Sequence, residues 1–364
     1  RRFFREVLTV FRPHLTQRQL VVLNNTNQTQ GTRMSSSSPI NMKAIVATAS
    51  GPSLTSVPVP KPGPDQVLVK VHAAALNRAD LGMLKGRSHG NVGGAGTPLG
   101  LEWAGEVEQI GEAVKNWQVG DRVMAAGGNA FAEYAIGHCD RIYPAPTELS
   151  YEEAATLPIA LQTEHDAIVT NGQLLPGQSI LVQGASSGVG LMAMQIAKAF
   201  GAGLVIGTST NEARREQLAK YGADIVVNSN DEHWVKQVID ATDGNGVDLT
   251  IDHVSGPVGN ANMKATKVGG RIINVGRLGG MHGDFNYDLH ALRRIQYLGV
   301  TFRTRTGKEV SSIVKKVTES LLSSFTGQEL QLPIHQVFPL AEATDALAMM
   351  GRNEHFGKIV LRVV

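Results

Sequence analysis

The sequence is poor in the residue types that several protein classes need. It has one cysteine, Cys139, among 364 residues, which excludes an internal disulfide framework and any zinc site built from several cysteines. Aromatic residues make up 5% of the chain, and no stretch approaches the roughly 20 apolar residues of a membrane-spanning helix. We therefore expect a globular protein without a membrane partner, long enough for two domains with their own cores.

Acidic residues are scarce at the start of the chain only. The first 33 residues contain six arginines against Glu6, a balance of +5. Since the formal net charge is +2, the remainder carries −3. That balance does not favour a surface for phosphate backbones, and we expect no nucleic-acid partner.

Residues 1–41 are interpreted as a leader that is disordered or serves in targeting. Their first part, "RRFFREVLTVFRPHLTQRQL", is amphipathic, rich in arginine and poor in acids, as organelle transit peptides are. The alternative is that translation starts at Met34 or Met42 and that the preceding residues lie upstream. A cytoplasmic location follows from the second interpretation, and a mitochondrial one from a genuine transit segment in residues 1–33.

Two sequence patterns divide the rest of the chain. From residue 42 to about 150, short alternating segments such as "QVLVKVHAAA" predict a β-rich domain. From about 175, apolar strands begin near residues 179, 203, 224, 248, 271 and 297, with helical stretches between them, among them "NEARREQLAKYGA". This succession predicts an α/β protein with a doubly wound parallel sheet. The final "GKIVLRVV" is expected to pair with the first domain, so that residues 42–165 plus 330–364 form one domain and 166–329 an inserted one.

The segment "LVQGASSGVGLMAMQIAKAFGA" (181–202) reads as a strand, a turn of small residues and a helix. A turn of this kind lets a pyrophosphate approach the free N–H groups at the start of the helix. The glycine fingerprint is incomplete, because Ala185 stands at its first position and a serine at its second. We expect a dinucleotide at the residues Ser186, Ser187, Gly188, Val189 and Gly190.

The end of the second strand indicates which dinucleotide binds. NAD sites place an acid there for the ribose hydroxyls, whereas this chain has Thr208 and Ser209, followed by Arg214 and Arg215. Hydroxyl donors and positive charge suit a 2′-phosphate, which favours NADPH. The alternative is that the arginines lie on a solvated helix face, which we expect of Arg215.

The chain resembles the medium-chain dehydrogenase/reductase superfamily, in particular its zinc-independent quinone oxidoreductase branch, which is similar to zeta-crystallin. The resemblance covers residues 42–364 and rests on "AAALNRADLGMLKG", "PLGLEWAGEVEQIG", "VGDRVMA", "AATLPIALQTEHDAI", the small-residue turn and "FGKIVL". It implies a GroES-like catalytic domain beside a Rossmann domain, and a homodimer. Two-fold pairing of the edge strand "YLGVTFR" is one way to form that dimer.

The resemblance also implies site residues. Asn77, Asp80 and Thr163 would lie near the nicotinamide, with holding a loop or starting a helix as their alternative roles. Later loops would complete the cofactor groove, with ordinary loop structure as the alternative, at Asp252, Val254, Val275, Gly276, Arg305 and Lys358. Zinc enzymes of the superfamily have a cysteine ligand near Asn77 and a His-Glu pair at "GLEW", where this chain has Leu101, so we expect no metal.

The reaction implied is NADPH-dependent hydride transfer to a small-molecule quinone or other α,β-unsaturated carbonyl, without zinc. An enoyl-thioester reductase is the alternative enzyme. A crystallin-like or RNA-binding protein that binds NADPH with little turnover is the alternative outside catalysis.

Overall fold

The computed structural model describes residues 40–90, 92–94, 96–326 and 329–364. The predicted leader therefore lies outside the described residues, apart from its last two positions. Asn41 already belongs to strand β1 (Asn41–Thr48), which pairs antiparallel with β2 (Gly51–Pro58). Within the described part, no helix has the length and apolar character to cross a membrane.

The β-rich part contains a seven-stranded sheet. Its order is β14-β15-β3-β4-β5-β7, and β6 also pairs with β3. The central strand is β3, whose alternating valines are buried. The bounds are β3 (Gln66–Ala75), β4 (Glu102–Ile110), β5 (Arg122–Ala126), β6 (Tyr134–His138), β7 (Tyr143–Pro144), β14 (Ile334–Pro339) and β15 (Lys358–Arg362).

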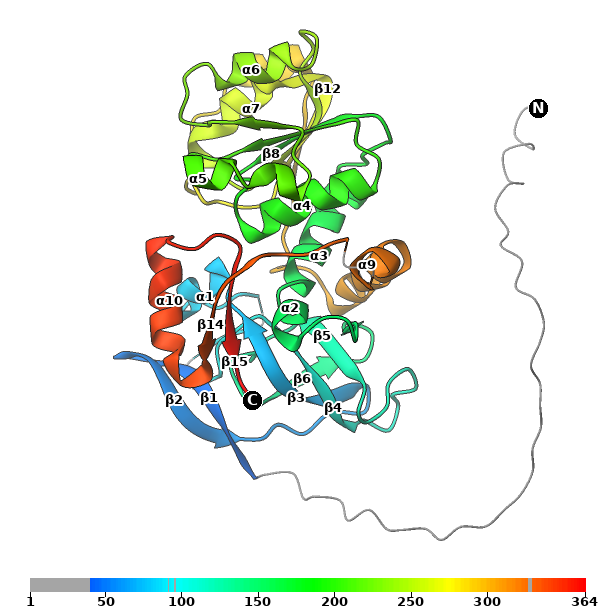
Figure 1. Cartoon of the computed structure of the whole chain (residues 1–364), viewed down its shortest axis with the longest axis vertical. Coiled ribbons are helices and arrows are strands. Elements are labelled where there is room, and N and C mark those ends of the chain that lie inside the picture. Colours follow the sequence, from blue (N-terminus) through cyan, green and yellow to red (C-terminus); the bar gives the residue numbers. More distant parts are fainter. Residues whose placement is uncertain (1–39, 91, 95, 327–328) are drawn as a thin grey trace, which may run out of the picture. The chain divides into compact units, whose positions relative to one another are not determined.

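The second sheet has six strands, and all of its pairings are parallel. Its order, β10-β9-β8-β11-β12-β13, is that of a doubly wound fold, which confirms the predicted class (Figure 1). The strands are β8 (Ser179–Gln183), β9 (Leu204–Thr208), β10 (Ile225–Val227), β11 (Val247–Asp252), β12 (Thr266–Asn274) and β13 (Gln296–Gly299). Strand β12 begins five residues before the start expected at 271.

Short helices connect these strands and cover the sheets. Helix α4 is buried over most of its length, because nearly all of "GVGLMAMQIAKA" is small or apolar. The helices are α1 (Arg78–Leu84), α2 (Tyr151–Ala155), α3 (Pro158–His165), α4 (Gly188–Ala199), α5 (Glu212–Arg215), α6 (Trp234–Asp240), α7 (Gly259–Ala265), α8 (Tyr287–Arg293), α9 (Gly307–Thr326) and α10 (Ala343–Arg352). A π-helix, η1 (Asp166–Asn171), continues α3, and 3₁₀ turns η2 (Leu218–Tyr221), η3 (Gly256–Val258) and η4 (Leu340–Glu342) complete the set.

The end of the chain returns to the first sheet, as expected. Strand β15 pairs antiparallel with β3, with Val360 opposite Ala75, and parallel with β14 (Figure 1). The six-stranded sheet is therefore inserted between strands of the first one.

One expected helix is wrong. The segment "NEARREQLAKYGA" forms the single turn α5 and then the 3₁₀ turn η2, rather than one continuous helix. Only Leu218 is buried in these two elements, so the segment has little apolar surface to hold a longer helix. Its closing glycine, Gly222, does take the left-handed conformation of a helix end, with φ of 97°.

Candidate functional site

The turn between β8 and α4 is built as a helix start with free donors. Ser187 is the N-cap of α4: its hydroxyl accepts from the Gly190 N–H at 3.1 Å and donates to the Gly184 carbonyl at 2.8 Å. The N–H groups of Gly188 and Val189 lie in the first turn, where a helix offers no intrahelical acceptor. Together with the helix dipole, these donors suit a phosphate group.

The two glycines of this turn are needed for different reasons. A Cβ on Gly190 would lie 2.5 Å from the Gly184 carbonyl oxygen, so backbone atoms exclude any side chain there. A Cβ on Gly188 would lie 3.0 Å from Cδ of Lys358, the first residue of β15. The returning strand thus lies directly against the start of α4.

Hydroxyl groups join this turn to the end of β9. The Ser186 and Ser209 hydroxyls are 3.0 Å apart, and Thr208 donates to the Gln183 side chain at 2.7 Å and accepts from the Gly184 N–H at 3.2 Å. Thr208 is fully buried, so its bonds hold the turn in place.

Positive charge gathers beyond the end of β9. Arg214 donates to the carbonyl of Asn353, and Arg78 donates to the Asn353 side chain at 2.9 Å. Burial, then Arg78 and Arg214, lower the pKa of His355 to about 4, so this imidazole is neutral near pH 7. Each guanidinium has five N–H donors, and donors therefore remain for an anion. We call Arg78, Arg214 and His355 the basic corner.

The sequence predicts that Arg215 lies on a solvated helix face. The structure differs from this prediction, because the side chain bonds the backbone. Its guanidinium donates to the Ser209 carbonyl at 3.0 Å and is half-buried. The short α5 turn brings this side chain back over the end of the preceding strand.

A buried cluster joins α1, β4 and β15. The Lys358 ammonium lies 2.5 Å from Glu102 Oε1 and 3.0 Å from Asn77 Oδ1, and Asn77 donates to the same Glu102 oxygen at 2.8 Å. The other Glu102 oxygen accepts from the Ile159 N–H at 3.0 Å. Burial raises the pKa of Glu102, while Lys358 opposes that shift.

Glu102 is the residue of this cluster that the sequence did not single out. In the sequence it is only the acid beside Leu101 in "GLEW". Glu102 and Lys358 are 256 residues apart, so no local sequence pattern links them. They meet because β4 and β15 belong to the same seven-stranded sheet.

Asp80 lies beneath Asn77 and is fully buried. One carboxylate oxygen accepts from the Asn77 N–H at 2.7 Å, while the other is buried and finds no hydrogen-bond partner in the described part of the chain. Burial raises the pKa of Asp80 to about 7. This arrangement supports the loop-holding role that was one of the two sequence interpretations.

Thr163 lies on helix α3, which follows β7 of the β-rich part and precedes β8 of the parallel sheet. It is the sixth residue of the helix and half-buried, so it is not the helix-start hydroxyl considered as its alternative role. Ahead of it, the Ile159 N–H at the start of α3 is held by Glu102.

The loops after the later strands converge at the same edge of the sheet. Asp252 accepts from the N–H groups of Val254 at 2.9 Å and Ser255 at 2.8 Å, and its own carbonyl accepts from Val275 at 2.9 Å and Gly276 at 3.0 Å. These bonds fix the backbone beside the turn.

Arg305, after β13, pairs with Asp166 at 2.5 Å. The guanidinium is thereby tied to the start of η1. The structure places Arg305 at this contact, and its predicted role toward a cofactor stays a prediction.

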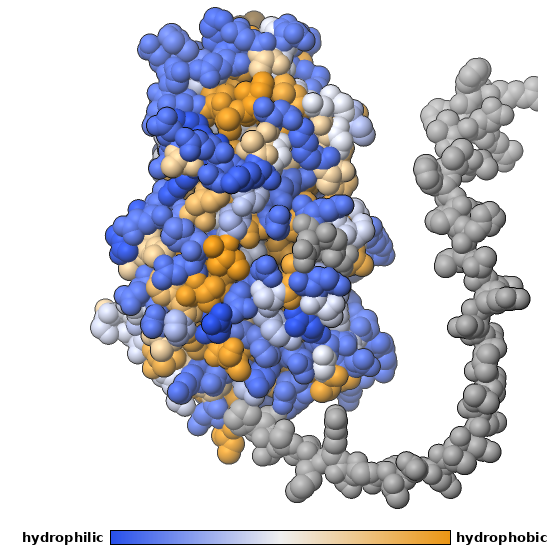
Figure 2. All heavy atoms as spheres, viewed as in Figure 1, coloured by the Kyte–Doolittle hydropathy of each residue, from blue (hydrophilic) through white to orange (hydrophobic). Residues whose placement is uncertain are grey.

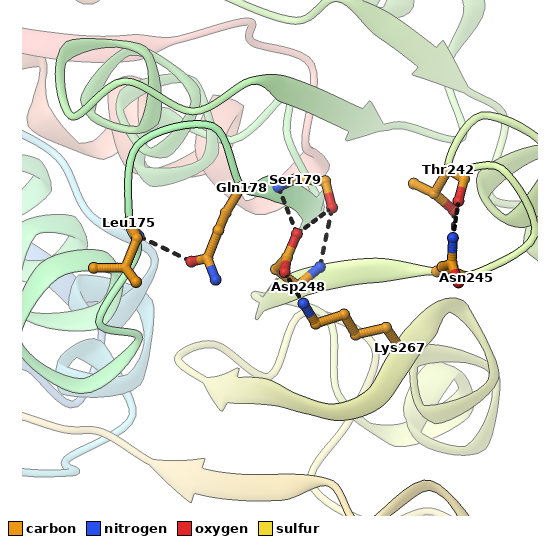
Figure 3. A network of polar contacts seen from close by, with 8 residues as sticks. Leu175, Gln178, Ser179, Thr242, Asn245, Asp248 and Lys267 are labelled. Atoms are coloured by element: carbon orange, nitrogen blue, oxygen red, sulfur yellow. Dashed lines mark hydrogen bonds and ion pairs between the residues drawn. The ribbon is translucent and has the colours of Figure 1, made fainter.

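A hollow lined by Asp243, Asp248, Lys267 and Arg293 lies at the opposite edge of the six-stranded sheet. Its polar groups bond one another: Ser179 donates twice to Asp248 at 2.8 Å, and Lys267 pairs with Asp248 (Figure 3). Since coenzymes bind at the carboxyl ends of parallel strands, this network at the strand starts serves to join β8 and β11.

Comparison with known proteins identifies the family. Residues 63–156 match a model described as the alcohol dehydrogenase GroES-like domain, and residues 188–319 match one described as zinc-binding dehydrogenase. The quinone oxidoreductase of Sus scrofa is 32% identical over 227 residues, which are 62% of this chain and 68% of that protein. The chain belongs to the medium-chain dehydrogenase/reductase superfamily. Members of this superfamily are oxidoreductases that bind a nicotinamide coenzyme.

Other relatives of the superfamily are much longer. A phenolphthiocerol/phthiocerol polyketide synthase subunit of Mycobacterium tuberculosis is 31% identical over 303 residues, which are 83% of this chain. This chain spans 14% of the length of that protein. Among solved structures, an alcohol dehydrogenase superfamily protein from Novosphingobium aromaticivorans matches with a TM-score of 0.80 and 27% identity over 89% of this chain and all of that one.

The side chains around Asn77 and Glu102 do not suit the zinc ion that one of these family descriptions names. Leu101 precedes Glu102, whose carboxylate already bonds Lys358, Asn77 and a backbone N–H. Among the described residues, one group of three side chains could hold a metal, namely His138, Cys139 and Asp140. His138 pairs with the first residue of β3, about nine residues or ~30 Å from the end that leads to Asn77.

Proposed function

We propose that the chain is an NADPH-dependent reductase of quinones or other α,β-unsaturated carbonyls that works by direct hydride transfer without zinc. The observation that carries the proposal is the site around the β8–α4 turn. It combines free helix-start donors, a strand end without an acid, and the basic corner beyond it. The similarity to a quinone oxidoreductase supports the class of acceptor.

The choice of NADPH rests on charge. A 2′-phosphate carries close to two negative charges and would be repelled by the carboxylate that NAD sites place after the second strand. Here Ser209 occupies that region, Arg214 follows it on α5, and Arg78 bonds the same Asn353 as Arg214 does. Arginine presents several donors to phosphate oxygens at once.

The residues around the β8–α4 turn mainly position the reactants. When bound, the nicotinamide supplies a hydride, and a solvent proton completes the reduced product. The stem of Lys358 lies against the start of α4, while its ammonium is paired with Glu102. Asn77 and Glu102 hold that ammonium in place. Quinones need little acid catalysis, so positioning accounts for most of the expected rate.

An enoyl-thioester reductase is the second candidate. It is favoured by the similarity to polyketide synthases over 83% of the chain and by a structural likeness to the CurF ER cyclopropanase (25% identity, TM-score 0.76). Such an enzyme would bind the same coenzyme and would differ in the molecule that accepts the hydride.

Oxidation of NADPH by the purified full chain, with 9,10-phenanthrenequinone, 1,4-benzoquinone or crotonyl-CoA as acceptor, tests these proposals. We expect turnover with the quinones and little with the thioester. Turnover restricted to the thioester would favour the second candidate. Tight NADPH binding without oxidation would favour the crystallin-like or RNA-binding alternative.

A further inference from the structure

A chain of buried polar side chains runs below the β8–α4 turn. Glu164 on α3 lies 2.9 Å from Nε2 of His253, and Nδ1 of His253 lies 2.9 Å from the Gln183 carbonyl. The Gln183 side chain in turn accepts from Thr208 and donates to Asn262 at 2.8 Å. All five side chains are at most 1% exposed.

The Glu164–His253 pair is costly to bury and is held in one geometry. A carbonyl accepts only, so Nδ1 of His253 carries a proton, and a second proton is shared between Nε2 and the carboxylate. Burial lowers the pKa of His253, and the nearby Glu164, with Asp252, outweighs this and raises it. The second Glu164 oxygen is buried and has no hydrogen-bond partner among the residues that the structure describes. Apolar residues of similar size often stabilise a core as well as such a pair does, which suggests a role besides stability.

The place of the pair in the fold indicates that role. Glu164 follows Thr163 on α3, whereas His253 follows β11 directly, beside the loops at the coenzyme edge. At the other end of α3, Glu102 holds the Ile159 N–H and binds Lys358. Helix α3 is thus tied to the β-rich part by one buried carboxylate and to the parallel sheet by another.

We propose that Glu164 and His253 are positioning residues for hydride transfer, which set helix α3 and its Thr163 relative to the coenzyme-binding turn. The inference rests on the proposed function. Neither residue is exposed to a ligand, so both act through others: Glu164 through α3, and His253 through the Gln183 backbone at the end of β8. Misplacing reactants by about 1 Å can cost two orders of magnitude in rate.

The test compares Glu164→Leu, which removes the acceptor, with Glu164→Gln, whose amide can donate to a neutral His253. Readouts are kcat, the Kd of NADPH and the primary isotope effect with NADPH deuterated at the transferred position, using the best acceptor of the parent. For Glu164→Leu we expect kcat to fall at least tenfold, the isotope effect to rise and Kd to change less than threefold. Glu164→Gln should recover most of kcat. Asp240→Asn, which breaks the exposed Lys236–Asp240 pair, is the matched control and should change none of the three readouts.

Other outcomes separate this inference from the proposed function. If Glu164→Leu binds NADPH and keeps the parental kcat and isotope effect, the pair is structural only and the inference is wrong. If Glu164→Leu does not fold, His253→Gln takes its place with the same expectations, and loss of folding in both variants would assign the pair to stability alone. A parent without quinone turnover would instead contradict the proposed function, and any thioester turnover would still allow the isotope effect to be measured.

Discussion

The guanidinium groups of Arg214 and Arg215 are neighbours in sequence but have different surroundings. Arg214 faces Asn353 in the basic corner, whereas Arg215 bonds the carbonyl of Ser209. We expect Arg214→Ala to raise KM for NADPH at least tenfold and to change KM for NADH less than twofold, because only NADPH has the 2′-phosphate. Initial-rate kinetics with both coenzymes measure this. Arg215→Ala is the control and should affect both coenzymes alike; the same pattern for Arg214→Ala would contradict its role.

The burial of Asp80 predicts how the stability of the fold depends on pH. Its pKa is about 7 in the folded protein, against 3.8 for an ordinary aspartate, so the folded state keeps a proton that the unfolded chain loses. The associated stabilisation is complete below about pH 4 and is lost as the pH rises to 7. Asp80→Asn should remove this dependence and stabilise the protein near pH 8 by up to about 4 kcal/mol. Urea unfolding across this range measures it, and parallel pH profiles for parent and variant would refute the assignment.

At the scale of elements, the β8–α4 turn distinguishes two glycines. In Gly190→Ala the new methyl group would lie 2.5 Å from a backbone oxygen, whereas in Gly188→Ala it would lie 3.0 Å from a side-chain carbon of Lys358. We expect Gly190→Ala to lower the free energy of unfolding by about 1–3 kcal/mol and to weaken NADPH binding at least tenfold. Gly188→Ala should cost less in stability. Thermal unfolding and coenzyme titration compare the two, and equal losses would show that the backbone contact at Gly190 is not decisive.

At the scale of the whole molecule, the surface around β13 is the candidate dimer interface. Figure 2 shows one face, on which hydrophobic patches are set among mainly hydrophilic residues. Strand β13 forms an edge of the described six-stranded sheet, and Phe285 lies 6.1 Å from Tyr297 and 4.9 Å from Tyr287, ring to ring. Tyr287 is 79% exposed, and the neighbouring stretch of sequence also contains Met281 and Leu292, which are 72% and 70% exposed. An unpaired edge beside exposed aromatic side chains favours pairing with a second copy.

Tyr297→Lys tests this assembly. We expect the parent to have the mass of a dimer in light scattering and the variant that of a monomer, because a charge at the edge strand opposes pairing. Val119→Lys, at another exposed position, should leave the mass unchanged. A monomeric parent would exclude the homodimer.

The order of the elements was determined by the sequence itself. Apolar segments predicted β3 and β15 of the first sheet and all six strands of the second, and the small-residue turn predicted the helix that follows it, which begins at Gly188. These signals arise from backbone propensity and burial of neighbouring residues, which act over a few positions. Where the local signal was weak, as between residues 211 and 223, the expected helix was wrong.

The tertiary structure alone decided which side chains meet. Glu102 pairs with a lysine 256 residues away, Glu164 with a histidine 89 residues away, and Arg214 with a carbonyl 139 residues away. No periodicity links such positions, because their contact depends on strand order and on the return of β15 to the first sheet. Local chemistry along the chain therefore located the coenzyme turn, while the folding of distant segments against it set the charges that surround it.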